Sequence, residues 1–224
     1  MCAIVGSFDP QTIIELVRVN SYRGNFSWSI TGINESHFII DKQKGFGEFP
    51  EDLFLELTEK HKSKDLYWLC HVQAPTGGMV EDVSRIHPAR RCDRNSYAEN
   101  EVYLWHNGVI KTKWMDTQPG ASKFDTQLMV DKIVKNDQQG KDLSKALYDI
   151  DGSFACALLW ESCFIRIFRN TASPMFVNGT DISSVKYKEM EKIESGVIYD
   201  LNVDCREITV VEEFDNVNKP FFFG

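Results

Sequence analysis

The chain opens with Met1-Cys2-Ala3-Ile4-Val5-Gly6-Ser7-Phe8, in which a cysteine leads directly into an apolar run typical of a buried strand. Removal of Met1 would leave Cys2 with both a thiol and a free α-amine. An α-amine titrates at about 7.7–8.0 and a thiol near 8.5, so the amine can take the thiol proton directly or through water. The stretch therefore predicts an N-terminal nucleophile. By itself, a cysteine after methionine is more often just a small residue, and the rest of the chain must decide between these interpretations.

Length and composition favour a single folded unit. The chain has 224 residues, 42% of them hydrophobic, and no recognisable linker, so we expect one domain over residues 1–224. Its formal charge is −8 and the acidic residues are scattered, which argues against nucleic-acid binding. There is no cationic segment followed by a long apolar run, so we predict neither a signal peptide nor a membrane span, and a cytoplasmic location.

Hydrophobic periodicity alternates between strand and helix patterns along the chain. Asp9 and Pro10 predict an N-cap and first turn for a helix over 10–20. The other expected helices cover 51–60, 124–136 and 143–150. The expected strands cover 2–8, 27–33, 37–40, 66–72, 102–106, 153–160 and 163–168, with shorter ones near Met175, Val185, Val197 and Ile208. We expect loops over 41–50 and 73–100. Strands with helices grouped between them predict an α+β fold with helices packed on largely antiparallel sheets.

Several short motifs follow Cys2 in a characteristic order. They are Arg23-Gly24, His71-Val72-Gln73-Ala74-Pro75-Thr76-Gly77-Gly78, Ile86-His87-Pro88, His106-Asn107-Gly108-Val109-Ile110, Phe124-Asp125-Thr126-Gln127 and Asp151-Gly152-Ser153-Phe154-Ala155. Their order and spacing resemble the glutaminase domain of class II glutamine amidotransferases, which are N-terminal-nucleophile (Ntn) hydrolases. The resemblance covers essentially the whole chain, and the segments at 106–108 and 151–155 are its most specific parts.

The resemblance implies a four-layer αββα sandwich that releases ammonia from glutamine through a thioester on Cys2. It assigns the oxyanion hole to Asn107 and the backbone N–H of Gly108. A side-chain amide and a backbone N–H can both donate to one developing oxyanion, and each such donor is typically worth about 10²–10³ in rate. Asn-Gly by itself more often forms a plain type I′ turn, and it is His106 and the distant Cys2 that favour the catalytic interpretation.

The resemblance also implies a substrate-binding set. It places Asp125 on the α-ammonium of glutamine, although a helix N-cap is an equally good local interpretation of this residue. The remaining candidates for substrate binding are Arg23, Gln73, Thr76, Gly77 and His87. Paired glycines at 77–78 suit a loop that closes over the substrate, and an ordinary turn explains them too. His71 and His106 are interpreted as hydrogen-bonded packing residues rather than bases.

Two positions depart from the family pattern. Gln73 occupies the position of an arginine that holds the α-carboxylate of glutamine, and a neutral amide cannot replace a guanidinium fork. Phe26 stands where the family usually has aspartate. Three accounts remain open: another cation from the group Arg85, Arg90, Arg91 and Arg94 holds glutamine, the substrate is an amide with a blocked carboxylate, or catalysis has been lost. We favour the first, although four arginines in a polar loop are usually a solvated surface.

The remaining sequence features argue against a metal site and a nucleotide cofactor. The histidines and the six cysteines do not stand at metal-ligand spacings, and no phosphate-binding glycine motif is present, so we expect no metal and no nucleotide cofactor. The cysteines are expected to be reduced and mostly buried.

The leading hypothesis is a glutaminase-type amidotransferase domain acting on glutamine or a related amide, with a separate synthetase or acceptor protein as partner. The segment 220–224 is a candidate docking element for it, or it folds onto its own core. The alternatives are a non-catalytic binding or regulatory protein on the same fold and an Ntn hydrolase of a different amide.

Overall fold

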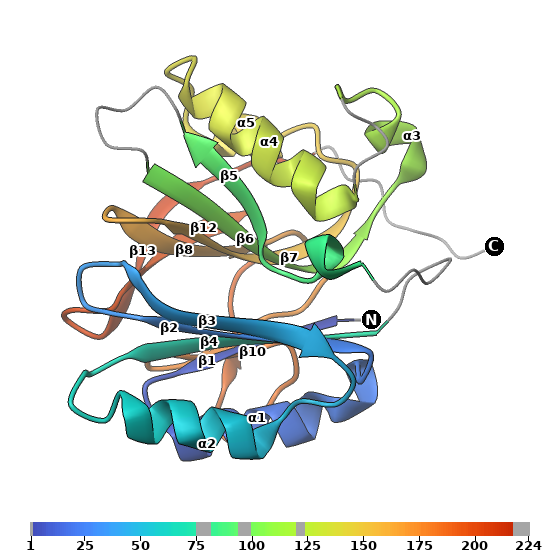
Figure 1. Ribbon diagram of the computed structural model, residues 1–224. Helices are drawn as coiled ribbons and strands as arrows, with labels where there is room; N and C mark the ends of the chain where they lie inside the picture. Colours follow the sequence, from blue (N-terminus) through green and yellow to red (C-terminus); the bar gives the residue numbers. More distant parts are fainter. Residues whose placement is uncertain (1, 75–81, 94–99, 120–123, 217–224) are drawn as a thin grey trace.

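The structure is a computed structural model that describes residues 2–74, 82–93, 100–119 and 124–216. In this part of the chain the strands form two sheets, which lie face to face (Figure 1). The first sheet has the strand order β11-β9-β10-β1-β4-β2-β3 and the second the order β13-β12-β8-β7-β6-β5. Every pairing between neighbouring strands in the two sheets is antiparallel.

The strands of the seven-stranded sheet are β1 (Cys2–Ser7), β2 (Ser27–Ile33), β3 (Ile39–Phe46), β4 (Tyr67–Gln73), β9 (Phe176–Asn178), β10 (Asp181–Ser183) and β11 (Glu191–Lys192). Those of the six-stranded sheet are β5 (Ala89–Asp93), β6 (Asn100–Ile110), β7 (Gly152–Trp160), β8 (Phe164–Arg169), β12 (Val197–Asn202) and β13 (Glu207–Glu213). Helices α1 (Pro10–Asn20) and α2 (Glu51–Lys60) cover the outer face of the first sheet. Helices α4 (Asp125–Asp137) and α5 (Leu143–Leu147) cover the outer face of the second, and α3 (Thr112–Met115) lies beside them (Figure 1).

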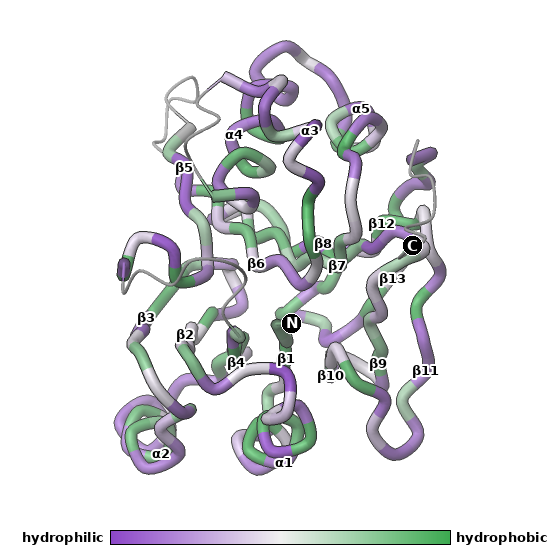
Figure 2. Tube along the Cα trace, turned by 90° about the vertical axis from the view of Figure 1, so that its right-hand side faces the viewer, coloured by the Kyte–Doolittle hydropathy of each residue, from purple (hydrophilic) through white to green (hydrophobic). Residues whose placement is uncertain are grey.

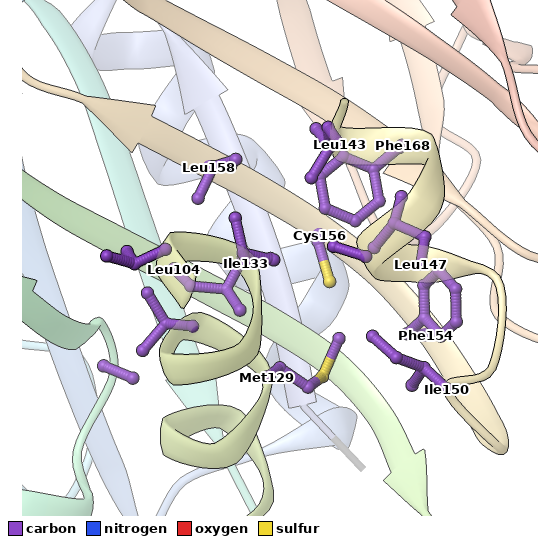
Figure 3. Packing of buried hydrophobic residues seen from close by; sticks show 14 of the residues in the cluster. Leu104, Met129, Ile133, Leu143, Leu147, Ile150, Phe154, Cys156, Leu158 and Phe168 are labelled. Carbon is purple, nitrogen blue, oxygen red and sulfur yellow. The ribbon is translucent and has the colours of Figure 1, made fainter. Parts of the chain in front are cut away.

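Three layers of buried side chains hold this sandwich together. One lies between α1, α2 and the first sheet, one between the two sheets, and one between α4, α5 and the second sheet. In the third layer, Leu104 and Cys156 of the sheet pack against Met129 and Ile133 of α4 and Leu147 of α5 (Figure 3). The predicted four-layer αββα sandwich is therefore confirmed. Among the described residues, no helix is long and apolar enough to cross a bilayer.

Most predicted elements agree with the structure to within a few residues. The N-cap of α1 is confirmed, because the carboxylate of Asp9 accepts hydrogen bonds from the backbone N–H groups of Gln11 and Thr12. Cys70 and Cys156, which lie within apolar runs, are buried as expected for most of the cysteines. The prediction that most thiols are buried is too broad, since Cys163 and Cys205 are exposed.

Three strand predictions were wrong. β3 continues to Phe46 through the expected loop, because its polar residues pair with β2 at the edge of the sheet. The expected irregular segment 73–100 contains β5, another edge strand, whose charged residues hide its strand pattern. The strand expected to stop at His106 continues to Ile110, because Asn107 and Gly108 pair with Ala155 and Phe154 of β7. The Asn-Gly pair is thus part of a strand and not a hairpin turn.

Candidate active site

Cys2 is the first residue of β1, and its side chain points between the two sheets. Along β1, Ile4 packs in the layer between the sheets, whereas Ala3 and Val5 pack against the helices. Because side chains alternate along a strand, Cys2 shares the inward face with Ile4. Its exposed fraction is 7%. Cys2 therefore stands at the end of a central strand, and Figure 2 shows the N-terminus in the middle of the molecule, beside β1.

The register between β1 and β4 sets the neighbour of Cys2. Cys2 pairs with Gln73 and Ile4 with His71. The backbone N–H and C=O of Ile4 both bond Ser184, on the far side of β1 from β4, at 3.0 Å each. Ile4 and His71 therefore form a non-hydrogen-bonded pair. Since the pair type repeats every second residue, Cys2 and Gln73 form such a pair too, and opposing side chains lie closest in pairs of this kind.

Burial dominates the acid–base properties of the thiol. It raises the pKa of Cys2 to about 11, and the negative charge of Asp125 adds to this increase. A hydrogen bond from the backbone of Ala74 and the charge of Arg23 act in the opposite direction. The guanidinium of Arg23 is anchored by its Nε, which donates to the carbonyl oxygen of Cys2 at 3.0 Å. The thiol is therefore protonated at neutral pH and needs a base before it can attack a substrate.

Asn107 and Gly108 approach from the opposite sheet. The side chain of Asn107 is 2% exposed, and its Nδ2 donates to Ser184 Oγ at 3.2 Å. The same oxygen accepts the N–H of Ile4. Ser184 thus links the Asn107 amide to β1 at Ile4, two residues beyond Cys2. Gly108 is required by close packing, since a Cβ at this position would lie 1.9 Å from the carbonyl oxygen of Ser153.

Asp125 is the first residue of α4, and its side chain is 29% exposed. One carboxylate oxygen accepts the backbone N–H of Thr126 at 2.8 Å. The other lies 3.7 Å from Nδ1 of His106. The negative charge of this carboxylate contributes to the raised pKa of the Cys2 thiol. The alternative of an N-cap is wrong, because the N-cap position belongs to Phe124.

Three buried histidines lie behind these residues. His71 Nε2 donates to the carbonyl oxygen of His106 at 3.2 Å and so bridges the two sheets. His106 Nε2 donates to the Ser153 carbonyl, and its Nδ1 contacts the Thr126 hydroxyl, both at 3.2 Å. The predicted packing role of His71 and His106 agrees with these contacts.

His87, a candidate for substrate binding, belongs to the same cluster. Its ring centroid lies 4.1 Å from that of His71, and its Nδ1 accepts the backbone N–H of His106 at 3.4 Å. Its exposed fraction is 4%, and its ring also packs edge-on against Phe124. Burial and the neighbouring histidines hold the pKa of His87 well below its usual range, so it stays neutral. These contacts favour packing over substrate binding.

The candidate arginines of the polar loop have carboxylate partners of their own. Arg85 pairs with Asp82 at 3.6 Å, Arg91 pairs with Asp131 at 3.5 Å, and Arg90 pairs with Glu101. None of the three is directed at Cys2 by these contacts. Thr76, Gly77 and Arg94 lie outside the described residues, as do Gly78 and the terminal segment 220–224.

Two contributors to the site escaped the sequence analysis. Ser184 has no motif around it, and its role follows from pairing with Ile4, 180 positions away. Ala74 acts through its backbone, for which the side chain gives no signal. Both were detectable only from the register of the strands around Cys2.

Comparisons with known proteins support the fold. No protein-family model and no curated protein sequence matches the chain. Among solved structures, it is similar to glutamine phosphoribosylpyrophosphate amidotransferase from B. subtilis complexed with ADP and GMP, with a TM-score of 0.64 and 15% identity over 96% of this chain. It is also similar to a structure described as the allosteric regulatory enzyme of purine biosynthesis, with a TM-score of 0.65, 15% identity and the same coverage. The chain spans 49% of the length of each. It therefore has the fold of the glutaminase domain of an Ntn amidotransferase.

Proposed function

We propose that the chain is a cysteine-dependent Ntn amidohydrolase of the glutamine amidotransferase type, which releases ammonia from a glutamine side chain. One observation carries the proposal. The inward-facing thiol of Cys2 lies at the end of β1, and the Asn107 amide is tied to the same strand through Ser184. A nucleophile and an oxyanion donor on facing sheets are the two groups that acyl transfer requires.

Before catalysis, Met1 is removed, which exposes the α-amine of Cys2. Because burial raises the pKa of the Cys2 thiol, the amine must take the thiol proton as sulfur attacks the carboxamide carbon. Asn107 Nδ2 and the Gly108 N–H donate to the oxyanion. The C–N bond then breaks, and the nitrogen leaves as ammonia with the proton from the amine. Water hydrolyses the thioester, which restores the thiol and yields a carboxylate.

Charged residues near Cys2 indicate how the substrate is held. Asp125 supplies an anion for the α-ammonium of the glutaminyl group, and Arg23 positions Cys2 through its carbonyl. The ammonia passes to an acceptor, on a separate synthetase or acceptor protein, or is released to water. We also propose that the protein acts in the cytoplasm, which rests on the sequence alone.

An intact-mass experiment tests this function. Purified protein is incubated with a diazoketone analogue of glutamine, both as the free acid and as its α-amide. Loss of Met1 and a single adduct with at least one of the two analogues is expected. Cys2→Ala should abolish the adduct, whereas Cys163→Ala, which removes an exposed thiol, should leave it unchanged. Processed protein that reacts with neither analogue would contradict the proposal.

A second candidate function is a non-catalytic binding protein on the same fold. It is favoured by the burial that keeps the Cys2 thiol protonated at neutral pH. Retention of Met1 would block the amine that serves as the base, and such a protein would form no adduct with either analogue. The same spectrum therefore separates the two functions.

A further inference from the structure

Asn170 is a buried polar residue directly after β8, and the proposed reaction does not use it. Its exposed fraction is 3%. The carboxamide makes two hydrogen bonds to the start of β7. Its Oδ1 accepts the backbone N–H of Phe154 at 3.1 Å, and its Nδ2 donates to the carbonyl oxygen of Gly152 at 2.8 Å. One side chain therefore holds the backbone on both sides of Ser153.

The backbone of Asn170 also bonds β7. Its N–H donates to the carbonyl oxygen of Phe154 at 3.0 Å, so both backbone groups of Phe154 are directed at the β8 side of β7. Phe154 is paired with Gly108 across β6 and β7, and this pair is consequently a non-hydrogen-bonded one. The N–H and C=O of Gly108 therefore point away from β7.

A second contact on β6 agrees with this orientation. His106 stands two residues before Gly108 and has the same backbone orientation, and its N–H donates to Nδ1 of His87 at 3.4 Å. His87 precedes β5, which flanks β6 on the side opposite β7. The pairing of β5 with β6 begins at Leu104 and runs away from Gly108. The Gly108 N–H is thus directed past the end of β5, as a donor to a substrate oxyanion requires.

Ser153 connects Asn170 to Gly108. Its carbonyl oxygen would lie 1.9 Å from a Cβ on Gly108, so the two backbones are in close contact. The same oxygen accepts a hydrogen bond from His106 Nε2 at 3.2 Å, and the Ser153 hydroxyl accepts the N–H of Val109 at 3.0 Å. Ser153 therefore contacts β6 before, at and after Gly108. Where Asn170 holds the start of β7 thus decides where this part of β6 lies.

We infer that Asn170 is a positioning residue for the candidate oxyanion donor Gly108. It acts through residues 152–154 of β7, which its carboxamide holds from one side and Gly108 contacts from the other. The inference rests on the proposed function, in which the Gly108 N–H donates to the oxyanion. Loss of the two side-chain hydrogen bonds lets the start of β7 shift, so the donor moves out of line with the oxyanion, whereas Cys2 on the other sheet keeps its place.

A comparison of kcat, KM and thiol alkylation tests the inference. Ammonia release is measured with glutamine and with its α-amide. In Asn170→Ala we expect kcat on the better substrate to fall at least about tenfold, which is part of the factor of about 10²–10³ that one oxyanion donor contributes. KM should stay within about twofold. The rate of iodoacetamide alkylation at Cys2, followed by mass spectrometry, should also stay within about twofold, because alkylation forms no oxyanion.

Asn202→Ala is the matched control. Asn202 Oδ1 accepts the backbone N–H groups of Asp204 and Cys205 in the turn between β12 and β13, at the end of the sheet where β7 ends and not where it begins. This variant also loses two hydrogen bonds from an asparagine side chain to the backbone, and it should keep kcat. An equal fall of kcat in the two variants, or an unchanged kcat in folded Asn170→Ala, would overturn the inference.

A second variant covers the case in which Asn170→Ala does not fold. Asn170→Leu has a side chain of similar volume that makes neither hydrogen bond, so the same fall in kcat is expected, and an unchanged kcat would overturn the inference. Either result with active wild-type protein leaves the proposed function intact. Wild-type protein that releases no ammonia from either substrate and forms no diazoketone adduct would refute the proposed function itself.

Discussion

The seven-stranded sheet and the six-stranded sheet contribute different chemistry to the same end of the molecule. The first provides the candidate nucleophile Cys2, the neutral side chain of Gln73 and the backbone of Ala74. The second provides the candidate oxyanion donors Asn107 and Gly108, and the helix packed on it provides the anion Asp125. In Figure 2, which looks down the axes of α1 and α2, β1 faces β6 and β7 across the middle of the molecule.

Because each sheet contributes different residues, the candidate site exists only where the two sheets contact each other. The polar contacts that join the two sheets include one from Asn107 to Ser184 and one from His71 to the His106 carbonyl. A buried polar contact that loses one partner leaves the other unsatisfied, so these contacts fix how the sheets are placed. Perturbing one sheet at a time should therefore separate nucleophile reactivity from oxyanion stabilisation.

Asn107→Ala removes a donor of the six-stranded sheet and leaves the nucleophile in place. We expect kcat for ammonia release to fall about 10²–10³-fold, or about 2.7–4 kcal/mol, since the oxyanion loses one hydrogen bond. Steady-state kinetics measures this effect. The control is Asn20→Ala, which removes a buried amide at the end of α1 and should keep kcat. An unchanged kcat in Asn107→Ala would exclude its oxyanion role.

Gly108→Ala tests whether the glycine is required by packing. The new Cβ would lie 1.9 Å from the Ser153 carbonyl oxygen, so β6 and β7 must separate locally. We expect a loss of about 3 kcal/mol in the free energy of unfolding, measured with urea. Gly140→Ala, where a Cβ meets nothing within 4 Å, should cost about 1 kcal/mol for its positive φ. Equal losses in the two variants would show that the close contact relaxes freely.

Acid should weaken the contact between the sheets. Burial lowers the pKa of His71 from 6.5 to about 3. The unfolded chain therefore takes up this proton first, and stability that is present above pH 6.5 falls as the pH decreases toward 3. The expected loss between pH 6.5 and pH 5 is about 2 kcal/mol. His71→Gln, which keeps a donor for the His106 carbonyl, should reduce this slope in urea titrations. An unchanged slope would assign the acid sensitivity to other groups.

Ser184→Ala should affect the placement of Asn107 more than the nucleophile. Without the hydroxyl, Asn107 Nδ2 loses its partner. We expect kcat to fall about tenfold, or about 1.4 kcal/mol, while the rate of adduct formation at Cys2 changes little. Ser183→Ala is the matched control, because Ser183 bonds Asn20 on the opposite face of the sheet. Equal effects of the two substitutions on kcat would contradict a positioning role.

Asp125→Asn should have the smallest effect on the thiol itself. Burial is the main cause of the raised pKa of Cys2, and the charge of Asp125 is a lesser one, so its removal should lower that pKa by a fraction of a unit. The midpoint of iodoacetamide alkylation against pH measures the shift. At the same time KM for a substrate with an α-ammonium should rise. Asp131→Asn, on the same helix, is the control and should change neither the alkylation midpoint nor KM. An unchanged midpoint in Asp125→Asn would show that the charge of Asp125 does not affect the Cys2 thiol.

Local sequence was sufficient for elements with strong periodicity or capping. The helix of 10–20 was predictable because Asp9 and Pro10 mark its start and isoleucine and leucine residues recur on one face. Edge strands were not predictable in this way, because the residues of β3 and β5 do not alternate in polarity along the sequence. The extension of β6 through Asn107 and Gly108 depended on β7, which overrides the turn preference of Asn-Gly.

The sequence by itself determined the layered α+β fold and the identity of the candidate nucleophile, because periodicity and a cysteine at position 2 are local properties. The tertiary structure decided which groups surround that cysteine. It placed Gln73 opposite Cys2, connected Asn107 to β1 through Ser184, and paired Arg85, Arg90 and Arg91 with other carboxylates. The physical reason is that strand register and sheet packing join residues up to 180 positions apart, and no local pattern encodes such pairs.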